Sequence, residues 1–283
     1  MQDLAGAHAL VTGGGTGIGL GIARRLLEAG AVTTLAGRRE DVLEAAAKEL
    51  GAAIPDAPEI RTIGCDVCDP EAVEAAVEHA SDGEGRLQVA VANAGVGAGG
   101  PFLMLEADAL RHVLDVNVVG AFNTLRAAAL RMRDAGGSII AISSIAGALG
   151  GRFRAAYATS KAGLDMLVRS GADELGGFGI RINSLRPGVV PSEATSPLFN
   201  FPDIVQDYER QMPLGFVGAP EDIGDAVVWL ASPASRWVTG QNIAVDGGHT
   251  LRRAPDFERA IRAQLGEEAY AQVVKPGFGP AGT

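Results

Sequence analysis

Short apolar runs alternate with segments of helical spacing along most of the chain. Each run is followed by small or polar residues, and the helical segments carry apolar residues three and four positions apart. This order of strand, turn and helix is typical of βαβ units. The predicted strands cover residues 8–12, 31–36, 59–64, 87–92, 137–142, 179–185 and 242–245. The predicted helices are one that ends near Gly30 and then 40–50, 70–80, 107–134, 155–175 and 220–230.

The first of these turns is rich in glycine. Residues 12–19 read TGGGTGIG and stand between the first predicted strand and the first helix. Glycines at 13, 17 and 19 leave no side chain between the backbone and a ligand, and the helix that follows presents unpaired N–H groups and the positive end of its dipole. The turn predicts a site for the pyrophosphate of a dinucleotide, although such turns also occur where elements pack closely.

The composition fits one globular domain with an appendage. The chain has 283 residues, of which 47% are hydrophobic and 20% are charged. We expect one dinucleotide-binding and catalytic domain over residues 1–250 and a partly helical C-terminal extension with a mobile end over 251–283. The net charge of −10 disfavours nucleic acid and anionic membranes as partners. No stretch approaches the roughly 18 uninterrupted apolar residues of a membrane span and no signal-peptide pattern is present, so we expect a cytoplasmic protein.

The cysteines and histidines do not form a metal-binding pattern. Cys65 and Cys68 have Cys-x-x-Cys spacing, but there is no second cysteine pair, and the four histidines are scattered without ligand spacing. We therefore predict neither a metal site nor a redox motif.

The end of the second predicted strand indicates which dinucleotide binds. An NAD-binding protein usually has a carboxylate here for the ribose 2′-hydroxyl, whereas this chain has Gly37 followed by Arg38 and Arg39. A guanidinium can hold a 2′-phosphate that a carboxylate would repel. We expect NADP(H) to be preferred over NAD(H), although two arginines at a helix start can also be merely solvated.

Further polar residues follow the next strands or interrupt helices. Asp66 follows the third strand, on the ligand side of an open α/β sheet, and Asn93-Ala94-Gly95 follows the fourth. Asn117 lies among apolar residues within a predicted helix, where asparagine is unfavourable, which suggests a local polar task or a brace for the helix.

The fifth strand and the helix after it supply the chemistry of proton transfer. The strand leads to Ser143 and Ser144, and the helix contains Tyr157 and Lys161, which are four residues apart and therefore share one face. Reduction of a carbonyl by hydride places negative charge on its oxygen, so a proton donor and a polarising hydrogen bond are needed. Tyr157 can be that donor, and a nearby ammonium favours the phenolate form.

In this order, the motifs resemble the short-chain dehydrogenase/reductase family over roughly residues 4–250. They are TGGGTGIG, Asn-Ala-Gly at 93–95, a serine thirteen residues before the tyrosine of YATSK, and the closing PEDI…TGQNIAVDGG. The resemblance implies a Rossmann-type doubly wound α/β fold with a seven-stranded parallel sheet flanked by helices on both faces. It also implies a homotetramer.

The resemblance assigns roles residue by residue. It implies that Asn117, Ser144, Tyr157 and Lys161 are catalytic: Tyr157 as acid and base, Ser144 bonding the substrate oxygen, Lys161 also holding the nicotinamide ribose, and Asn117 supporting a water in a proton path. The spacing to Tyr157 selects Ser144 over Ser143. The implied cofactor residues are Gly13, Thr16, Gly17, Ile18, Gly19, Arg38, Arg39, Asp66, Val67, Asn93, Gly95, Tyr157, Lys161, Pro187, Gly188, Val190 and Ser192. Ser192 stands where the family usually has threonine, and Phe216 where relatives commonly have arginine.

The substrate is predicted only by class. We expect an apolar pocket formed by Val96, Ala148, Leu149, Phe153, Val190, Phe199, Phe201, Tyr208 and Met212. Such a pocket favours a small hydrophobic ketone or secondary alcohol, and Arg152 and Arg154 can attract a carboxylate or phosphate.

Two other functions compete with this one. A 3-oxoacyl thioester reductase ranks lower, because Asp173 stands where carrier-dependent relatives commonly have a basic residue. A catalytically idle NADP-sensing regulator on the same fold would not need the serine, tyrosine and lysine together.

The chain continues about thirty residues beyond the closing turn of the resemblance. Residues 256–265 have apolar positions at four-residue spacing and predict a helix. This helix either covers the substrate mouth or a neighbouring subunit, or docks on its own surface.

Residues 191–213, with four prolines, are expected to form a mobile excursion over the site.

Overall fold

One seven-stranded sheet runs through the computed structural model, which describes residues 4–193, 195–252 and 257–274. Its strands are β1 (His8–Thr12), β2 (Val32–Gly37), β3 (Ile60–Gly64), β4 (Val89–Ala92), β5 (Gly137–Ile142), β6 (Ile180–Pro187) and β7 (Asn242–Val245). Every neighbouring pair is parallel, and the order is β3-β2-β1-β4-β5-β6-β7. The predicted fold class is confirmed.

The central strands are apolar on both faces because helices cover the sheet on both sides. In β1, Ala9, Leu10 and Val11 are fully buried, as expected of strands in a parallel sheet. Ala9 is aligned with Val89 of β4. Successive side chains therefore point into two different cores.

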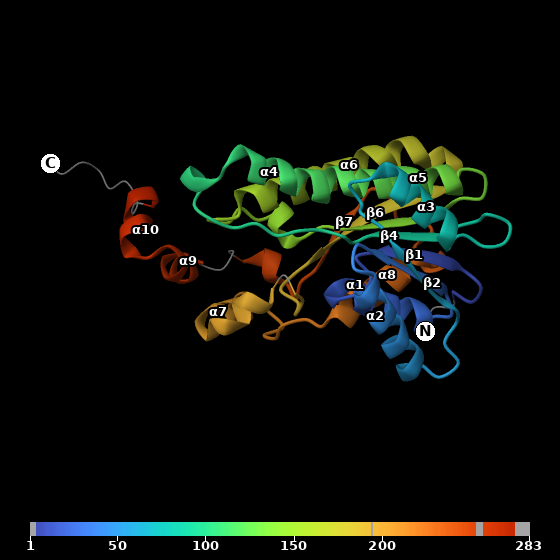
Figure 1. The fold of residues 1–283 in the computed structure, drawn as a ribbon, viewed down its shortest axis with the longest axis horizontal. Helices are drawn as coiled ribbons and strands as arrows, with labels where there is room; N and C mark the ends of the chain where they lie inside the picture. Colours follow the sequence, from blue (N-terminus) through green and yellow to red (C-terminus); the bar gives the residue numbers. More distant parts are fainter. Residues whose placement is uncertain (1–3, 194, 253–256, 275–283) are drawn as a thin grey trace.

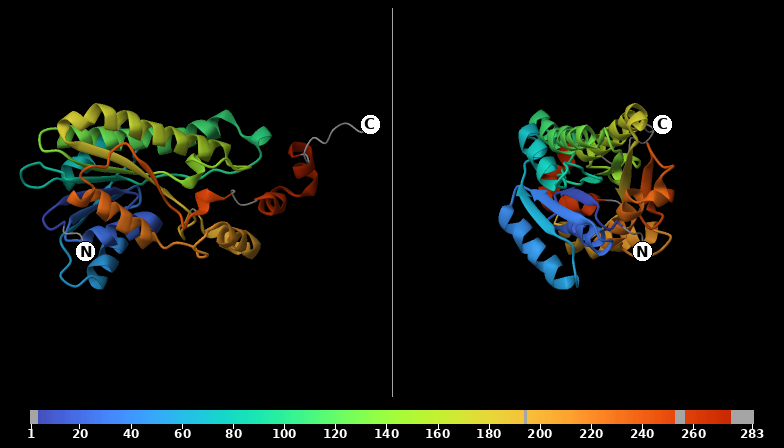
Figure 2. Two further views of the ribbon diagram at one scale, coloured as in Figure 1. Left: turned by 180° about the vertical axis from the view of Figure 1, so that it is seen from behind. Right: turned by 90° about the vertical axis from the view of Figure 1, so that its right-hand side faces the viewer.

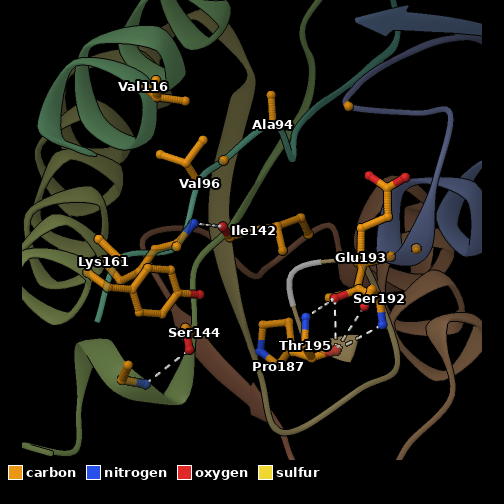
Figure 3. Close-up of a pocket in the computed structure, with 18 of the residues that line it drawn as sticks. Ala94, Val96, Val116, Ile142, Ser144, Lys161, Pro187, Ser192, Glu193 and Thr195 are labelled. Carbon is orange, nitrogen blue, oxygen red and sulfur yellow. Dashed lines mark hydrogen bonds between the residues drawn. The ribbon is translucent and has the colours of Figure 1, made fainter. Parts of the chain in front are cut away.

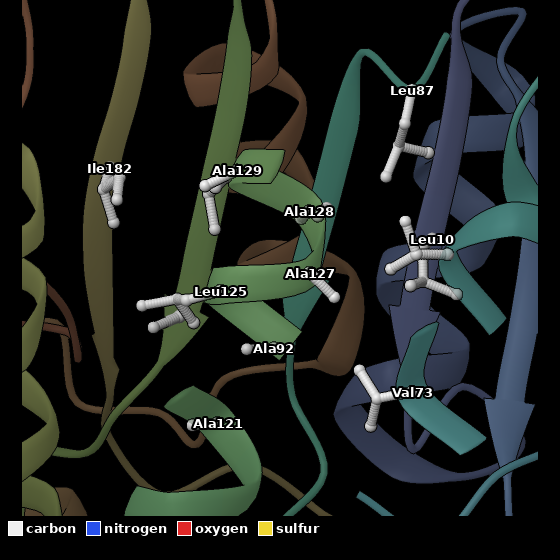
Figure 4. Close-up of a cluster of buried hydrophobic side chains, with 14 of the residues drawn as sticks. Leu10, Val73, Leu87, Ala92, Ala121, Leu125, Ala127, Ala128, Ala129 and Ile182 are labelled. Atoms are coloured by element: carbon white, nitrogen blue, oxygen red, sulfur yellow. The ribbon is translucent and has the colours of Figure 1, made fainter. Parts of the chain in front are cut away.

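Helices form a layer on each face of the sheet, as Figures 1 and 2 show. One layer contains α1 (Gly17–Glu28), α2 (Glu40–Ala53) and α8 (Pro220–Ala231), and the other contains α3 (Pro70–Ala80), α4 (Ala107–Leu114), α5 (Ala121–Met132) and α6 (Ala155–Leu175). The core under α3, α5 and α6 includes Leu10, Val73 and Leu125 (Figure 4). The opposite core packs Ile22 of α1 and Val227 of α8 against the sheet.

The helix predicted over residues 107–134 is not continuous. A π-helical turn, Asp115–Gly120, separates α4 from α5. A π turn inserts an extra residue into the helix, and this one contains the buried Asn117. Together these segments form the one stretch of the described residues, Ala107–Met132, that is long and apolar enough to cross a membrane, but half of its apolar window is buried inside the fold. This stretch is therefore part of the helical layer that packs on the sheet.

Three further helices lie beyond the carboxyl ends of the strands, and we call them the cap. They are α7 (Pro202–Gln211), α9 (Glu258–Leu265) and α10 (Glu267–Val273). In Figure 1, α9 and α10 lie apart from the sheet at the end where α4 and α7 are found. A separate apolar cluster joins α7 to the C-terminal helices through Ile204, Tyr208, Phe257, Ile261 and Tyr270.

The cap corrects two sequence-based expectations. Residues 191–213 contain α7 rather than only an irregular excursion, because Pro202 occupies the first turn of the helix, where its missing N–H costs nothing. The helix predicted over 256–265 is present from Glu258, and α10, which was not predicted, follows it after Gly266. Asp256 and the expected mobile end after residue 274 lie outside the described residues.

Candidate active site

A cavity of about 1380 Å³ opens at the carboxyl ends of the strands. Its walls include the turn after β1 and the turn after β4, between which the strand order reverses. Ligands of open α/β sheets bind at such a reversal. The cavity extends from the glycine turn, past the end of β2, to Tyr157 and the cap.

The glycine turn is shaped to receive a phosphate. Gly17, the first residue of α1, has φ of +52°, a conformation that favours glycine. A Cβ at Gly19 would lie 2.0 Å from the carbonyl oxygen of Gly13, so no other residue fits there. Asn93 stabilises the turn, because its Nδ2 donates to the carbonyl oxygens of Thr12 at 2.9 Å and Gly13 at 3.1 Å. The amide of Asn93 is thus used to hold the turn, although the residue also lines the cavity.

The end of β2 provides two arginines with different surroundings. Arg39 Nη2 lies 2.8 Å from Glu193 Oε2, across the cavity from β2, and this hydrogen bond raises the pKa of Arg39. Arg38 lines the cavity, and no carboxylate of the described residues lies within ion-pair distance of it. Gly37 is not required by packing, because a Cβ there would meet only Leu43 at an ordinary 3.6 Å.

Asp66 and Val67 line the same end of the cavity. Asp66 Oδ1 accepts from the N–H of Cys68 at 3.0 Å, and Asn123 Nδ2 donates to the carbonyl oxygen of Val67 at 2.9 Å.

The two cysteines, Cys65 and Cys68, are free thiols, and burial raises the pKa of Cys65 to about 11. Across the described residues no group of three or more His, Cys, Asp or Glu side chains is arranged to hold a metal ion.

Helix α6 brings Tyr157 and Lys161 to the opposite end of the cavity. Lys161 is 5% exposed, its Nζ donates to the carbonyl oxygen of Ile142 at 2.8 Å (Figure 3), and it lies 5.8 Å from the centroid of the Tyr157 ring. Burial lowers the pKa of Lys161, and the neighbouring Tyr157 and Asp165 oppose that shift. The ammonium is thus fixed beside the phenol by a backbone acceptor.

Asn117 connects three parts of the site. Its Nδ2 donates to the carbonyl oxygen of Val96 at 2.9 Å and to Ser160 Oγ at 3.0 Å, and its Oδ1 accepts from the N–H of Val96 at 2.8 Å. A Cβ on Gly95 would lie 3.1 Å from Asn117 Oδ1 and 3.5 Å from Lys161 Nζ. The turn after β4 therefore lies directly against α6, and Asn117 holds it there.

The two serines after β5 have different partners. Ser143 Oγ donates to the carbonyl oxygen of Lys161 at 3.3 Å. Ser144 Oγ accepts from the N–H of Ala146 at 3.1 Å, which leaves its own proton for another acceptor. In Figure 3, Ser144 and Lys161 lie on the same side of the pocket. The Ser144 hydroxyl therefore keeps a proton that it can donate, whereas that of Ser143 is used; that Ser144 is the catalytic serine stays a prediction.

The segment after β6 forms another part of the cavity wall. Pro187, Gly188 and Val190 line it. Ser192 lies against the glycine turn, since a Cβ on Gly17 would approach its Cβ to 2.8 Å. Ser192 Oγ lies 3.0 Å from Thr195 Oγ1, and Thr195 Oγ1 donates to the carbonyl oxygen of Val190 at 2.7 Å (Figure 3). Behind this segment, Arg186 Nε is paired with Asp165 Oδ2 at 2.7 Å, and this ion pair joins β6 to α6.

The remaining end of the cavity is lined mostly by apolar and aromatic side chains. Of the nine expected pocket residues, six line it: Val96, Leu149, Phe153, Val190, Phe201 and Tyr208. Ala148, Phe199 and Met212 do not; Met212 is buried in the cap cluster, and Phe199 is more than a third exposed. Phe153 has φ of +67°, an unusual value for a bulky residue.

Several lining residues were not predicted. Thr195 was missed because its role depends on the turn it forms with Ser192. Phe257, Ile261 and Gln264 of the C-terminal extension line the cavity from a position far away in sequence. The four-residue spacing of Phe257 and Ile261 was the available signal, but spacing does not say which surface a helix covers.

Comparison with known proteins places the chain in a family. A family model described as Enoyl-(Acyl carrier protein) reductase matches residues 13–250. The chain is 38% identical over 251 residues to galactitol 2-dehydrogenase (L-tagatose-forming) from Cereibacter sphaeroides, which is 88% of this chain and 96% of that protein. The chain belongs to the short-chain dehydrogenase/reductase family. It is therefore an oxidoreductase of alcohols and ketones that uses a nicotinamide dinucleotide.

Other short-chain dehydrogenases/reductases are similar over most of their length. Trans-4-hydroxycyclohexanecarboxylate dehydrogenase from Sinomonas cyclohexanicum is 36% identical, covering 86% of this chain and 92% of that protein. The structure of a short-chain type dehydrogenase/reductase from Mycobacterium ulcerans has a TM-score of 0.91 and 36% identity, covering 96% of this chain and 100% of that one. A match of that extent includes residues beyond 250, so the likeness continues into the C-terminal helices.

Proposed function

We propose that the protein interconverts a ketone and a secondary alcohol on a small, largely apolar molecule, with NADP(H) as cofactor. The observation that carries the proposal is that one cavity joins the glycine turn at one end to Ser144, Tyr157 and Lys161 at the other. A dinucleotide that lies along this cavity brings its reactive ring to the phenol.

The residues at the cofactor end fit a dinucleotide. The left-handed Gly17, the close approach at Gly19 and the start of α1 form a cradle that side chains would fill. We assign the pyrophosphate to Gly13, Thr16, Gly17, Ile18 and Gly19. The other contacts that we assign to the cofactor are Asp66, Val67, Asn93, Gly95, Pro187, Gly188, Val190 and Ser192. When bound, the nicotinamide supplies or accepts the hydride.

The preference for NADP(H) rests on the end of β2. The open space at Gly37 admits a phosphate, and Arg38 has no carboxylate partner among the described residues. A guanidinium without a counter-ion gains most from a phosphate. Arg39 contributes less, because binding a phosphate would compete with its ion pair to Glu193.

In the direction of reduction, Tyr157 donates its phenolic proton to the carbonyl oxygen as negative charge develops there. Ser144 donates a hydrogen bond to the same oxygen. The buried ammonium of Lys161 stabilises the phenolate that results. Asn117 holds the turn after β4 against Lys161. We assign to Asn117 the support of a water through which protons pass between Lys161 and solvent. In oxidation the same groups act in reverse.

The surroundings of the reacting group support an apolar substrate. Val96, Leu149, Phe153 and Phe201 line that end, and one similar protein is named for a substrate with an apolar ring, trans-4-hydroxycyclohexanecarboxylate. We further propose that the C-terminal extension covers the substrate mouth, because Phe257 and Ile261 line the cavity.

We propose that the enzyme is a cytoplasmic homotetramer. Helices α5 and α6 leave large apolar side chains exposed, namely Phe122, Leu130 and Met166, each between 44% and 56% exposed. Apolar groups of this size exposed on one layer are typical of a protein interface.

A second candidate, reduction of a 3-oxoacyl thioester, is favoured by the description of the matching family model. The exposed Asp173 on α6 opposes it, because an acidic carrier would meet an acidic residue there.

The deciding experiment is a turnover screen. Purified protein with NADPH or NADH is offered ketones, alcohols and 3-oxoacyl thioesters of graded size, and the absorbance of the reduced cofactor is followed. We expect turnover of free ketones with NADPH. Cofactor binding with no turnover of any compound would favour an NADP-sensing regulator.

A further inference from the structure

Arg154 occupies an unusual place in the wall of the substrate pocket. It immediately precedes α6 and lies three residues before Tyr157. Its guanidinium carbon lies 4.7 Å from the centroid of the Tyr157 ring and 5.4 Å from that of Phe257. The cation therefore lies close to both the ring of Tyr157 and that of Phe257, the residue before α9.

Arg154 differs from its neighbour Arg152 in how its charge is compensated. Arg152 is paired with Glu258 at 2.9 Å and donates to the hydroxyl of Tyr270 at 3.3 Å. For Arg154, no carboxylate oxygen within the described part of the chain lies within 4.0 Å. A half-buried cation without a counter-ion is costly. The sequence made these two arginines equivalent, but only Arg154 is available to a ligand.

The groups around Arg154 limit the anion that it can accept. Tyr208, whose hydroxyl interacts with Arg154, is buried, and Phe257 and Ile261 are apolar. The acidic lining residues, Asp66, Asp115 and Glu193, belong to the opposite end of the cavity. One guanidinium with one hydroxyl matches a carboxylate, which carries a single charge and accepts two parallel hydrogen bonds. A phosphate monoester carries more charge than these groups can balance.

We propose that Arg154 binds a carboxylate of the substrate, so that the enzyme acts on hydroxy and oxo carboxylic acids. Because the guanidinium is stacked on the Tyr157 ring, the carboxylate lies beside the phenol, and the reacting carbon is only a few atoms from it in the substrate. This assignment rests on the proposed reaction, and it names the class of substrate.

The test compares acids with their neutral counterparts. A panel of oxo acids of graded length and ring size, including 4-oxocyclohexanecarboxylate, is paired with the corresponding carboxamides. Binding to the enzyme in the presence of NADP is measured by calorimetry, and turnover is measured with NADPH. The variants are Arg154→Gln, Arg154→Lys and, as a control, Arg169→Gln, which changes an exposed arginine of α6.

We expect at least one acid to bind the wild type about tenfold or more tightly than its amide, because a hydrogen bond to a charged group contributes about 1.5–3 kcal/mol. Arg154→Gln should abolish that difference, Arg154→Lys should retain part of it, and Arg169→Gln should leave it unchanged. Equal binding of every acid and its amide, or no binding of either, would overturn the proposal.

The same measurements separate this proposal from the reaction itself. If an acid binds through Arg154 but no compound is turned over, the carboxylate site stands and the proposed reaction fails. If ketones are turned over while acids have no advantage over amides, the carboxylate site fails and the reaction stands.

Discussion

The sheet with its two helical layers and the cap are held together in different ways. Large side chains in the two main cores, such as Leu10, Ile22 and Leu26, are fully buried. The cap cluster is smaller than either of these cores, and its largest buried members are aromatic, namely Tyr208, Phe257 and Tyr270. Ion pairs at the surface supplement it, including Arg259 with Asp203 at 3.0 Å and Arg152 with Glu258 at 2.9 Å. The cap is therefore the less strongly anchored of the two regions.

This difference matches the demands on each end of the cavity. The groups that we propose for proton transfer project from the end of β5 and from α6, and such groups must be held to within about 0.5 Å. Substrate selection tolerates a segment that adapts, and segments of lower stability are commonly used for it. We call the sheet with its two helical layers the body. We infer that the body determines the reaction and the cofactor, whereas the cap determines the substrate.

The strongest challenge to this division compares one phenol in each region. Tyr157→Phe should reduce kcat by about 10²- to 10⁴-fold, the usual contribution of a positioned acid, with unchanged fold and NADPH affinity. Tyr208→Phe removes a hydroxyl from the cap side of the same cavity and should reduce kcat far less. Steady-state kinetics and fluorescence titration with NADPH measure both effects. Comparable losses in the two variants would contradict the division.

The next effect concerns the cofactor end of the body. Arg38→Ala should weaken NADPH binding by about 10- to 100-fold, since a charge-assisted hydrogen bond is worth about 1.5–3 kcal/mol, and should change NADH binding little. Arg39→Ala should cost less, because Arg39 is already paired with Glu193. Glu193→Gln, which releases Arg39, should strengthen NADPH binding. Titrations with both cofactors measure these affinities, and an equal loss for NADPH and NADH would refute the assignment.

Removal of an anchor of the cap should affect the substrate and spare the cofactor. Tyr270 is buried, its ring centroid lies 6.4 Å from that of Phe153, and it is not among the lining residues. Tyr270→Ala should raise KM for the substrate by about tenfold with little change in kcat, as expected when uniform binding is lost. Deletion of the residues after Leu251 should act in the same direction. Unchanged KM in both variants would mean that the C-terminal helices are only docked on the surface.

The two regions also differ in how far the sequence predicts them. Local patterns are sufficient to predict three features of the body, because period and spacing determine them. These are the strands, the glycine turn and the position of Tyr157 and Lys161 on one helix face. The π turn at Asn117 does not follow, since its reason is a contact with Val96 in a distant loop. Neither do the ion pairs of Arg152, Arg39 and Asp165, whose charged partners lie 106, 154 and 21 residues away in the sequence. Local spacing identifies the chemistry. Tertiary contacts decide which arginine of a pair is already bound to a carboxylate, as Arg39 and Arg152 are, and which can bind a ligand.

The smallest expected effect is a pH dependence confined to the cap. Hydrogen bonds from Arg262 and Arg152 lower the pKa of Glu258 below its ordinary value of 4.5. A carboxyl group with a lowered pKa stabilises the docked cap when it is ionised, and this contribution is lost as the pH falls through the lowered value. KM for the substrate should therefore stay constant above about pH 5 and rise modestly as the pH falls below about 4.5. The loss of this contact should not change the affinity for NADPH. In Glu258→Gln, KM should be raised slightly at neutral pH and should lack this rise. The same acid-dependent rise in wild type and variant would assign it to another group and would remove Glu258 from the account of how the cap is held.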